Sequence, residues 1–337
     1  MSLETLHPAS LEATCEPRTD VIDLSIVIVS WNVESHLRAC LESIKRQHVG
    51  FNLEVIVVDN DSQDGSATMV EDTFPQVSLV RNCDNVGFAG ANNQGLALSK
   101  GRYVLLLNPD TELHEGCLAR TIEYADEHPA LGAIGCRAIK PDGSQQSTLY
   151  RSLRLRDVLV NVLVPTGLRR RSHRLGGFRY AGIDLDMAHE VETIAGCFML
   201  VRREAYEQAG GMDETFFMYG EEAEWCWRLR QEGWSIGYCP DTSILHHGGV
   251  SAAQCLDEMN LAMARSQLLL LQRTRGIMVA WIANALMLLR DAPRAATWCL
   301  VRPFVMHRGA TKWSLLMRSA VRFRLHCGGL FRLDWSS

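Results

Sequence analysis

Closely spaced cysteine pairs are absent from this 337-residue sequence. Its 11 cysteines are scattered, odd in number and never arranged as C-x-x-C. This distribution argues against a disulfide framework and against a zinc knuckle, and it favours a reducing compartment. The first residues carry Glu4, Glu12 and Glu16 and have no apolar run of the kind that a secretory signal needs. We expect residues 1–22 to be a disordered leader.

Glycine-rich phosphate-binding loops are also missing. A nicotinamide-dependent oxidoreductase needs G-x-G-x-x-G after a strand, and Gly87-Phe88-Ala89-Gly90 does not fit that pattern. A sugar-phosphate nucleotidyltransferase shares the fold class expected below. It needs a loop rich in Gly and Lys after its first strand, where this sequence has Ser30-Trp31-Asn32. Both enzyme classes are therefore disfavoured.

The charge of the chain is unevenly distributed. Residues 255–337 carry eleven Arg and one Lys against four acids, a net charge of +8, whereas the whole chain has a net charge of −5. The main apolar stretch of this basic segment, residues 277–289, is too short to cross a bilayer of about 30 Å as a helix. Basic and apolar residues at helical spacing suit a helix on an anionic membrane surface, and they suit an ordinary helical subdomain equally well. The segment has no recognisable nucleic-acid-binding motif, so we expect no nucleic acid partner.

A buried strand that runs directly into an acid is the clearest positive signal. Residues 103–107 are five consecutive apolar residues, which is typical of an interior strand of a parallel sheet. Pro109 ends the strand because it has no N–H for the ladder. Asp110 therefore lies just beyond the carboxyl edge, where open α/β sheets bind their ligands. A carboxylate there can hold a divalent cation together with substrate phosphates, and taken alone it could equally cap the next helix.

The pattern of strand, polar turn and helix occurs three times before Asp110. Strands are predicted over residues 24–30, 53–58 and 77–81, and each is followed by a turn and a helical stretch. This order predicts a right-handed parallel α/β fold. The turns are rich in Asp and Asn rather than Gly. Because carboxylates repel phosphate, a ligand site here needs a metal or contacts to bases and sugars.

A second group of acids opens a helix predicted over residues 221–232. Acids in a first turn are expected from the helix dipole alone, and Glu224 with Arg228 forms an i,i+4 pair for which we predict a surface salt bridge. Glu221 and Glu222 differ because they follow a run of apolar and aromatic residues. A carboxyl group that emerges from such a wall has a raised pKa and suits a general base.

Two adjacent histidines follow the last predicted strand, residues 234–239. His246 and His247 stand beside a pair of glycines. Paired histidines at such a place can ligate a metal, act on phosphate or fill a turn. The pair alone does not separate these alternatives.

Together these segments resemble the inverting glycosyltransferases of family 2, in particular their rhamnosyltransferase-like branch. The resemblance covers about residues 24–275 and rests on six motifs in the order of the family: Ser30-Trp31-Asn32, residues 58–66, residues 85–93, Asn108-Pro109-Asp110, residues 216–234 and residues 246–251. It implies an α/β fold of the GT-A type (the nucleotide-diphospho-sugar transferase fold), with a mostly parallel central sheet flanked by helices and a C-terminal helical extension. The implied domains are a glycosyltransferase domain at 23–254, with a nucleotide-sugar half at 23–115 and an acceptor half at 116–254, and a basic, apolar extension at 255–337.

The resemblance also assigns roles to individual residues. Asp110 keeps the last acid of the family's D-x-D motif as a metal ligand, and His246 would face the metal or the diphosphate. Glu222 falls on the position of the catalytic base, where it replaces the family's usual Asp and reaches one methylene further. Glu221 and Trp225 are placed on the acceptor side. The residues implied to bind the nucleotide sugar are Ser30, Asn32, Asp59, Asp61, Asn85, Gly87, Phe88, Asn92 and Asn108, with Asp59 and Asp61 at the nucleobase and ribose.

The implied reaction is a single in-line displacement with inversion. Mg²⁺ or Mn²⁺ on Asp110 would neutralise the departing diphosphate, and Glu222 would take the proton of the acceptor hydroxyl. The donor would be a nucleotide-diphospho-sugar, dTDP-L-rhamnose by branch, and the acceptor a saccharide or a polyprenyl-diphosphate-linked sugar in cell-surface polysaccharide synthesis. Such an enzyme would be cytoplasmic and peripheral on the inner face of the cell membrane. The substitutions at Glu222 and Glu224 would also fit a degenerate paralogue that acts as a membrane-surface scaffold.

Overall fold

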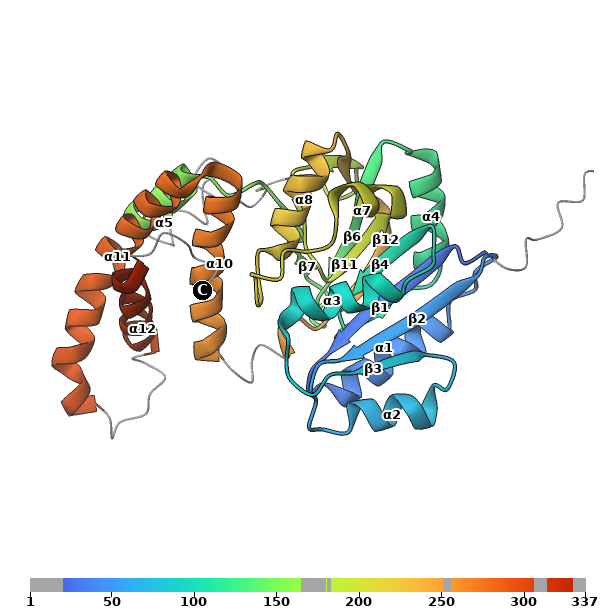
Figure 1. The fold of residues 1–337 in the computed structure, drawn as a ribbon, viewed down its shortest axis with the longest axis horizontal. Coiled ribbons are helices and arrows are strands. Elements are labelled where there is room, and N and C mark those ends of the chain that lie inside the picture. Colours follow the sequence, from blue (N-terminus) through green and yellow to red (C-terminus); the bar gives the residue numbers. More distant parts are fainter. Residues whose placement is uncertain (1–20, 165–179, 181–182, 251–255, 306–313, 330–337) are drawn as a thin grey trace, which may run out of the picture.

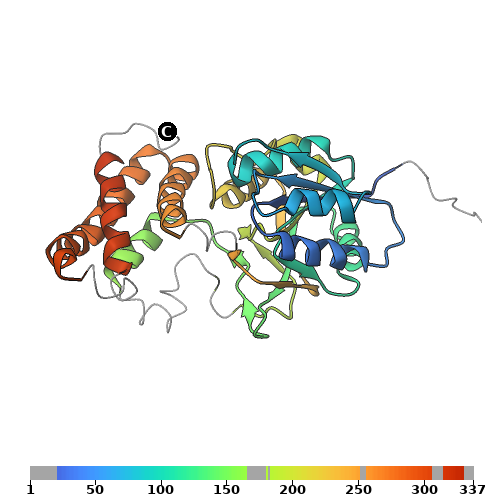
Figure 2. The ribbon, with the colours of Figure 1, turned by 90° about the horizontal axis from the view of Figure 1, so that it is seen from below.

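The computed structural model describes residues 21–164, 180, 183–250, 256–305 and 314–329. The leader expected at residues 1–22 lies outside this part of the chain except for its last two residues. The described residues form a sheet domain and, to one side of it, a module of helices (Figures 1 and 2).

Four parallel strands form the first half of the central sheet, in the order β3-β2-β1-β4. They are β1 (Leu24–Ser30), β2 (Leu53–Asp59), β3 (Ser78–Arg81) and β4 (Tyr103–Leu107). All residues of β1 and β4 are buried, which explains the continuous apolar runs at residues 26–29 and 103–107. The register pairs Ser30 with Asp59, so the polar residues that follow β1 and β2 meet at one edge of the sheet. The four strands predicted before Asp110 are confirmed to within one residue.

The second half of the sheet is mixed. β11 (Phe198–Arg202) runs antiparallel to β4 and to β6 (Leu131–Ile139), whereas β12 (Ser235–His246) runs parallel to β6 and pairs with β5 (Thr111–Leu113) at the edge. The short strands are β7 (Gln145–Gln146) on β6, β9 (His189–Val191) on β12, and the pair β8 (Leu149–Tyr150) and β10 (Thr193–Ile194). β12 is longer than the strand predicted over 234–239. An irregularity between Cys239 and Ser243 carries the chain past Pro240, which cannot donate to the ladder, and the strand then continues to His246.

Helices cover both faces of the sheet, which makes three layers. α1 (Glu34–Lys45), α2 (Ser66–Thr73) and α4 (Cys117–Glu127) pack on the face that includes Ile26 and Ile28. α3 (Gly87–Leu98), α7 (Arg203–Ala209) and α8 (Glu221–Gln231) pack on the face that includes Val27 and Val29. Successive residues of β1 thus enter opposite apolar clusters, as the strand period requires. The predicted α/β class, with a mostly parallel sheet and C-terminal helices, is confirmed.

The helical module consists of α10 (Leu256–Arg275), α11 (Ile277–Val305) and α12 (Ser314–Gly329), and α5 (Leu155–Leu163) packs on α11. The inner sides of α10 and α11 share an apolar cluster with Phe216 of the sheet domain, and α10 contacts α8. The inner side of the module therefore packs on the sheet domain, as expected for a helical subdomain. Within the described ranges, no helix combines the length and the hydrophobicity that a membrane span requires.

Candidate active site

A cavity of about 650 Å³ opens at the carboxyl ends of β1, β2 and β4. This is the edge at which open α/β sheets bind ligands, and the volume suits a small molecule. Six of the residues implied for the site by the sequence lie in its wall: Asn85, Gly87, Phe88, Asn108, Asp110 and His246. The wall also contains residues that the sequence did not single out for this site: Trp31, Asn60, Lys140, Gln146, Phe217, Met218 and Tyr219.

Asn60, directly after β2, organises one side of this cavity. Its Nδ2 donates to Asn85 Oδ1 at 2.8 Å and to the Gly87 carbonyl at 3.3 Å. Its Oδ1 accepts from Asn82 Nδ2 at 3.0 Å and from the Val86 N–H at 3.1 Å. The side chain is 2 % exposed, so these bonds are shielded from water. Asn60 therefore fixes the loop that leads into α3.

The two acids implied at the nucleobase and ribose, Asp59 and Asp61, lie beside the cavity and outside its wall. Asp59 is buried, and its Oδ2 accepts the Ser62 N–H at 3.1 Å. Its Oδ1 is buried and has no hydrogen-bond partner among the described residues. A buried carboxylate oxygen without a hydrogen-bond partner can accept a bond from an N–H or O–H group of a ligand. Asp61 adopts φ of 67° and accepts a bond from Gln63 Nε2 at 3.0 Å, so its nucleotide role stays a prediction.

Three other residues implied for donor binding also lie outside the cavity wall. Ser30 is fully buried at the end of β1, and Asn32, with φ of 52°, accepts the Gln63 N–H at 2.6 Å. Asn92 is buried within α3 and donates to the Phe88 carbonyl at 2.8 Å. These contacts shape the turns behind the cavity. Asn108 does line the cavity, and its buried Oδ1 has no partner within the described part of the chain.

Gly87 brings the segment before α8 against the start of α3. It has φ of +81°, and a Cβ there would lie 2.6 Å from the Phe217 carbonyl oxygen. The Phe88 N–H donates to that same oxygen at 2.8 Å. Only glycine permits both the backbone conformation and the close approach. As a result, Phe88, Phe217 and Tyr219 come together in the cavity wall.

Asp110 and His246 form a buried pair at the end of β4 and β12. His246 Nε2 lies 3.3 Å from Asp110 Oδ1, and the side chains are each 7 % exposed. Burial alone would raise the pKa of Asp110, but His246 outweighs it and holds that pKa below its ordinary value. Burial alone would lower the pKa of His246, but the interactions with Asp110 and Cys197 raise it to about 10. Asp110 and His246 therefore each favour the charged form of the other.

A divalent cation fits these two side chains. His246 Nδ1 donates to Gln146 Oε1 at 2.9 Å, while Nε2 is buried and makes no hydrogen bond. A histidine whose one nitrogen is fixed by an outer partner and whose other nitrogen faces a carboxylate is typical of a metal ligand. The described residues contain no cluster of three or more His, Cys, Asp and Glu ligands. The protein would therefore supply Asp110 and His246, and the donor diphosphate and water would supply the other ligands.

Lys140, at the end of the β6 segment, is the one Lys or Arg side chain that the described cavity wall contains. It sits on a short hairpin closed by the bond from its own N–H to the Ser144 carbonyl at 2.9 Å. An ammonium group in a cavity that holds a diphosphate would offset part of the negative charge. No local pattern in the sequence points to Lys140, because this residue reaches the cavity only when the hairpin folds back over it.

Glu222 faces a second, adjoining cavity of about 320 Å³. Tyr219 lines both cavities, whereas Glu222 lines only the second. The far wall of the second cavity is α10, which contributes Met263, Ser266, Gln267 and Leu270. The predicted base is thus separated from the Asp110–His246 pair by Tyr219, in a space partly built by the helical module.

Glu221 and Glu222 are adjacent acids in the first turn of α8, and Glu221 Oε2 is buried with no hydrogen-bond partner among the described residues. Burial, followed by the charge of Glu222, raises the pKa of Glu221 well above its ordinary value. Burial also raises the pKa of Glu222, and the Gly220 N–H, which donates to Glu222 Oε2 at 3.1 Å, opposes this rise. Of the two acids, Glu222 lines the second cavity and Glu221 does not.

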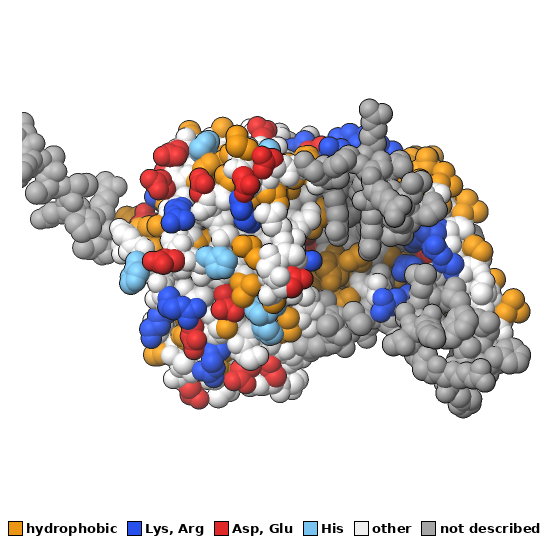
Figure 3. Space-filling view, turned by 180° about the vertical axis from the view of Figure 1, so that it is seen from behind, with side chains coloured by type: hydrophobic (Ala, Val, Ile, Leu, Met, Phe, Trp, Pro, Cys, Tyr) orange, Lys and Arg blue, Asp and Glu red, His pale blue; other side chains and the backbone are white. Residues whose placement is uncertain are grey.

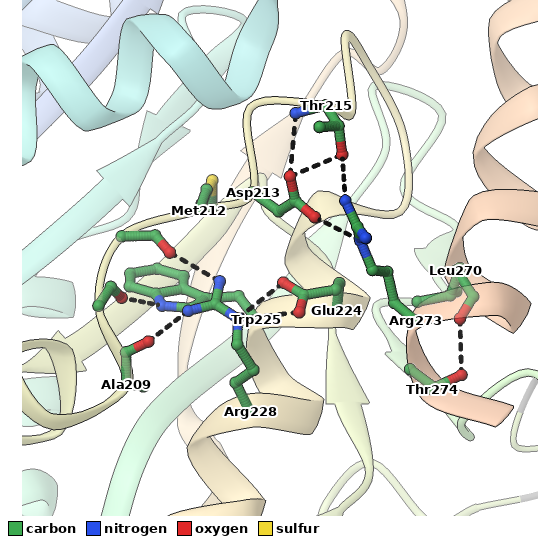
Figure 4. A network of polar contacts seen from close by, with 12 residues as sticks. Ala209, Met212, Asp213, Thr215, Glu224, Trp225, Arg228, Leu270, Arg273 and Thr274 are labelled. Carbon is green, nitrogen blue, oxygen red and sulfur yellow. Dashed lines mark hydrogen bonds and ion pairs between the residues drawn. The ribbon is translucent and has the colours of Figure 1, made fainter. Parts of the chain in front are cut away.

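Glu224 and Trp225 belong to a network of polar contacts that holds α8 in place, and they line neither cavity (Figure 4). Glu224 pairs with Arg228 as predicted, with Nε 2.9 Å from both carboxylate oxygens, but the Glu224 side chain is 4 % exposed, so the prediction of a surface salt bridge was wrong. Arg228 also donates to the carbonyls of Ala209 and Gly211, the latter at 2.6 Å. Trp225 is fully buried, donates to the Gly210 carbonyl at 2.8 Å and lines neither cavity, so its placement on the acceptor side is corrected. The bonds from Trp225 and Arg228 hold the turn at residues 209–211 against α8.

Comparisons with known proteins show the family to which the chain belongs. Residues 25–210 match the model of glycosyl transferase family 2, and residues 178–247 match the model described as the N-terminal domain of galactosyltransferase. An N-acetylglucosaminyl-diphospho-decaprenol L-rhamnosyltransferase of Mycobacterium tuberculosis is 30% identical over 245 residues, which cover 68% of this chain and 76% of that protein. The low-salt glycan biosynthesis hexosyltransferase Agl10 of Haloferax volcanii is 27% identical over 246 residues, covering 69% and 70%.

Solved structures show the same fold at lower sequence identity. The mannosyltransferase PcManGT from Pyrobaculum calidifontis, in complex with GDP-Man and Mn²⁺, has a TM-score of 0.52 at 17% identity, covering 91% of this chain and 88% of that one. GalNAc-T7 with UDP, GalNAc and Mn²⁺ has a TM-score of 0.51 at 16% identity, covering 67% and 43%.

The sheet order and the cavity at its carboxyl edge define a GT-A type nucleotide-diphospho-sugar transferase fold. The family model covers more than half of the chain. The chain therefore belongs to glycosyl transferase family 2 and is a glycosyltransferase, similar to the rhamnosyltransferases of that family.

Proposed function

We propose that this protein transfers a sugar from a nucleotide-diphosphate donor to a hydroxyl group of a lipid-linked saccharide, with inversion at the anomeric carbon. The observation that carries the proposal is the pair of adjoining cavities that share Tyr219. One cavity holds Asp110 and His246 at the ends of the strands, and the other holds Glu222. A donor in the first and an acceptor in the second would meet at Tyr219.

The residues of the first cavity suit the donor. Asn60 fixes Asn85 in the cavity wall where β2 ends and α3 begins, and Asp59 Oδ1, which has no partner among the described residues, lies beside them, so the Asn85 amide and a carboxylate oxygen would be offered to a nucleoside. Asp110 and His246 would hold a divalent cation, which when bound would neutralise charge on the diphosphate as it leaves. Lys140 would add a further positive charge at the same cavity.

The residues of the second cavity suit the transfer step. Glu222 lines this cavity whereas Glu221 does not, so Glu222 is the carboxylate that can reach an acceptor hydroxyl. It would take the proton of the acceptor hydroxyl while that oxygen bonds to the anomeric carbon on the face opposite the diphosphate. The bond between the anomeric carbon and the diphosphate oxygen breaks in the same step, and the leaving group keeps the electron pair. One displacement inverts the configuration and needs no second carboxylate as nucleophile.

The relatives suggest which substrates to test. The name of the Mycobacterium relative indicates transfer of L-rhamnose to N-acetylglucosaminyl-diphospho-decaprenol. We therefore take dTDP-L-rhamnose and a polyprenyl-diphosphate-linked saccharide as the first pair. The apolar α10 side chains Met263 and Leu270 in the second cavity are compatible with an acceptor attached to a lipid.

The test is transfer by the full-length protein with a panel of nucleotide sugars and a short-chain polyprenyl-diphosphate N-acetylglucosamine. We expect nucleotide diphosphate and glycosylated lipid to appear in equal amounts, and NMR of the product to show the anomeric configuration opposite to that of the donor. Glu222→Gln serves as the matched inactive control. A retained configuration would overturn the inverting mechanism. Failure to bind any nucleotide diphosphate in a thermal-shift screen with Mn²⁺ would favour a non-catalytic scaffold.

A further inference from the structure

The long helix α11 has two chemically different sides. Its inner side is buried in the module and includes Ala280, Ala283 and Met287. We define the outer face of α11 as Met278, Ile282, Ala285, Leu289, Ala296 and Leu300, all of which are exposed. The exposed fractions of its large side chains are 69% for Met278, 47% for Ile282, 69% for Leu289 and 74% for Leu300. Their spacing places them along one side of a helix.

Within residues 277–300, the part of α11 whose side chains the structure describes, no charged residue belongs to this outer face. Asp291 is fully buried on the inner side, and Arg290 and Arg294 turn toward it, at 2.9 Å and 3.6 Å. Arg322 of α12 reaches the same carboxylate at 3.1 Å. Three guanidinium groups thus surround one buried carboxylate on the inner side of α11 and leave a net positive charge there. Figure 3 shows hydrophobic side chains along the free edge of the module, with basic side chains next to them.

An anionic membrane is the occupant that this combination fits. Residues 255–337 carry a net charge of +8, so a negatively charged surface attracts the segment, whereas a second copy would bring two such segments together. An apolar stripe on a helix of a basic segment is typical of a helix that lies in the interface of a bilayer without crossing it. We infer that the protein docks on an anionic membrane through the outer face of α11, to which the net positive charge of residues 255–337 attracts it.

This surface deepens the proposed function and rests on it for its biological purpose. Gly276 joins α11 to α10, and α10 forms a wall of the cavity that contains Glu222. If the protein binds the membrane through α11, the cavity that contains Glu222 would be separated from the bilayer by one further helix, α10. A lipid-linked acceptor could then present its saccharide to Glu222 while its lipid remains in the membrane.

Point variants test this surface better than a truncation, because removing α11 would also expose the apolar cluster that it shares with α10. We propose Met278→Glu and Leu289→Glu in the full chain. Met187→Glu is the matched control, since Met187 is 60% exposed in a loop of the sheet domain. The readout is co-sedimentation at low salt with phosphatidylcholine vesicles that contain or lack phosphatidylglycerol.

We expect the wild-type protein and Met187→Glu to bind only the anionic vesicles. Met278→Glu and Leu289→Glu should each bind them about tenfold more weakly, because each loses one apolar side chain from the bilayer contact. Equal binding by all four proteins, or no binding by the wild type, would overturn the inference. So would a dimer in analytical ultracentrifugation that these two variants dissociate while vesicle binding stays unchanged. The assay contains neither donor nor acceptor, so its failure leaves the proposed transfer reaction untouched, and loss of transfer leaves vesicle binding untouched.

Discussion

Exchanging single carboxylates for amides in the first turn of α8 should separate a catalytic group from a structural one. Glu222→Gln keeps the size of the side chain and removes its ability to accept a proton. General-base catalysis contributes about 10²–10⁴-fold, so we expect turnover to fall by this factor, or about 3–5 kcal/mol in the activation free energy. Donor affinity should stay unchanged, because Glu222 lines the second cavity and not the first.

Glu224→Gln is the same chemical change two residues further along the helix, and we expect the opposite result. Its side chain is 4 % exposed, and both carboxylate oxygens bond to Arg228. Removing one partner of a buried pair costs about 3–5 kcal/mol in the free energy of unfolding. Arg228 remains 24% exposed and keeps its carbonyl partners, which should reduce this loss to about 1–3 kcal/mol. Turnover measured below the melting temperature should stay near that of the wild type.

The assay is a parallel measurement of kcat, donor dissociation constant and melting temperature for the wild type and the two variants. The reasoning requires a loss of turnover without a loss of stability for Glu222→Gln, and the reverse for Glu224→Gln. If Glu224→Gln is stable and inactive while Glu222→Gln still turns over, the base has been assigned to the wrong carboxylate. If Glu222→Gln melts as early as Glu224→Gln, its lost activity has a structural cause.

Four further predictions concern residues in and around the two cavities. Asp110→Asn should abolish transfer while circular dichroism stays unchanged, because Asp110 lies beyond the end of β4, and full wild-type activity in excess EDTA would contradict this. Lys140→Ala should raise the donor KM about tenfold with little change in kcat, and Lys140→Arg should recover most of the affinity; equal KM values would exclude a role for this charge. Gly87→Ala should lower the free energy of unfolding by about 2 kcal/mol or more, since its φ is +81° and the Cβ would lie 2.6 Å from the Phe217 oxygen; wild-type urea unfolding would contradict the close approach. Glu221→Gln should stabilise the protein at neutral pH, because the pKa of the Glu221 carboxyl group is raised in the folded state. The stability that Glu221 contributes is present below its ordinary pKa of 4.5 and is lost as pH rises through the raised pKa. Urea unfolding at acidic and neutral pH should show a smaller fall in the free energy of unfolding with rising pH for the variant than for the wild type.

Features that depend on neighbours in the chain could be predicted from the sequence. The strand at residues 103–107 is buried on both faces, so its apolar run is continuous, and Pro109 ends it where the structure ends β4. Asp110 is therefore found at the carboxyl edge, as expected. The pairing of Glu224 with Arg228 was likewise predictable, since i,i+4 contacts follow from helix geometry alone.

Features that depend on distant contacts could not be predicted in this way. Asn60 sits between two acids that attract attention, and its importance comes from bonds to residues 22–27 positions further along the chain. The burial of Glu224 and Trp225 arises because the turn at residues 209–211 folds over them. The stretch at residues 277–289 is apolar on nearly all sides, so periodicity alone could not tell its packed side from its exposed side.

The segment at residues 216–220 connects these observations, because α3 and α10 both hold it directly before the proposed base, Glu222. Tyr219 adopts φ of 69°, a left-handed conformation that costs a non-glycine residue roughly 1–2 kcal/mol. The segment is held by the bond from the Phe88 N–H to the Phe217 carbonyl at 2.8 Å and by the bond from Ser266 Oγ to the Met218 carbonyl at 2.9 Å. Ser266 belongs to α10, so a helix of the C-terminal module helps to keep Tyr219 between the cavities and fixes the residues that directly precede α8. The helical extension is thus part of the structure that positions Glu222, and a change in α10 should alter transfer even where it touches no substrate.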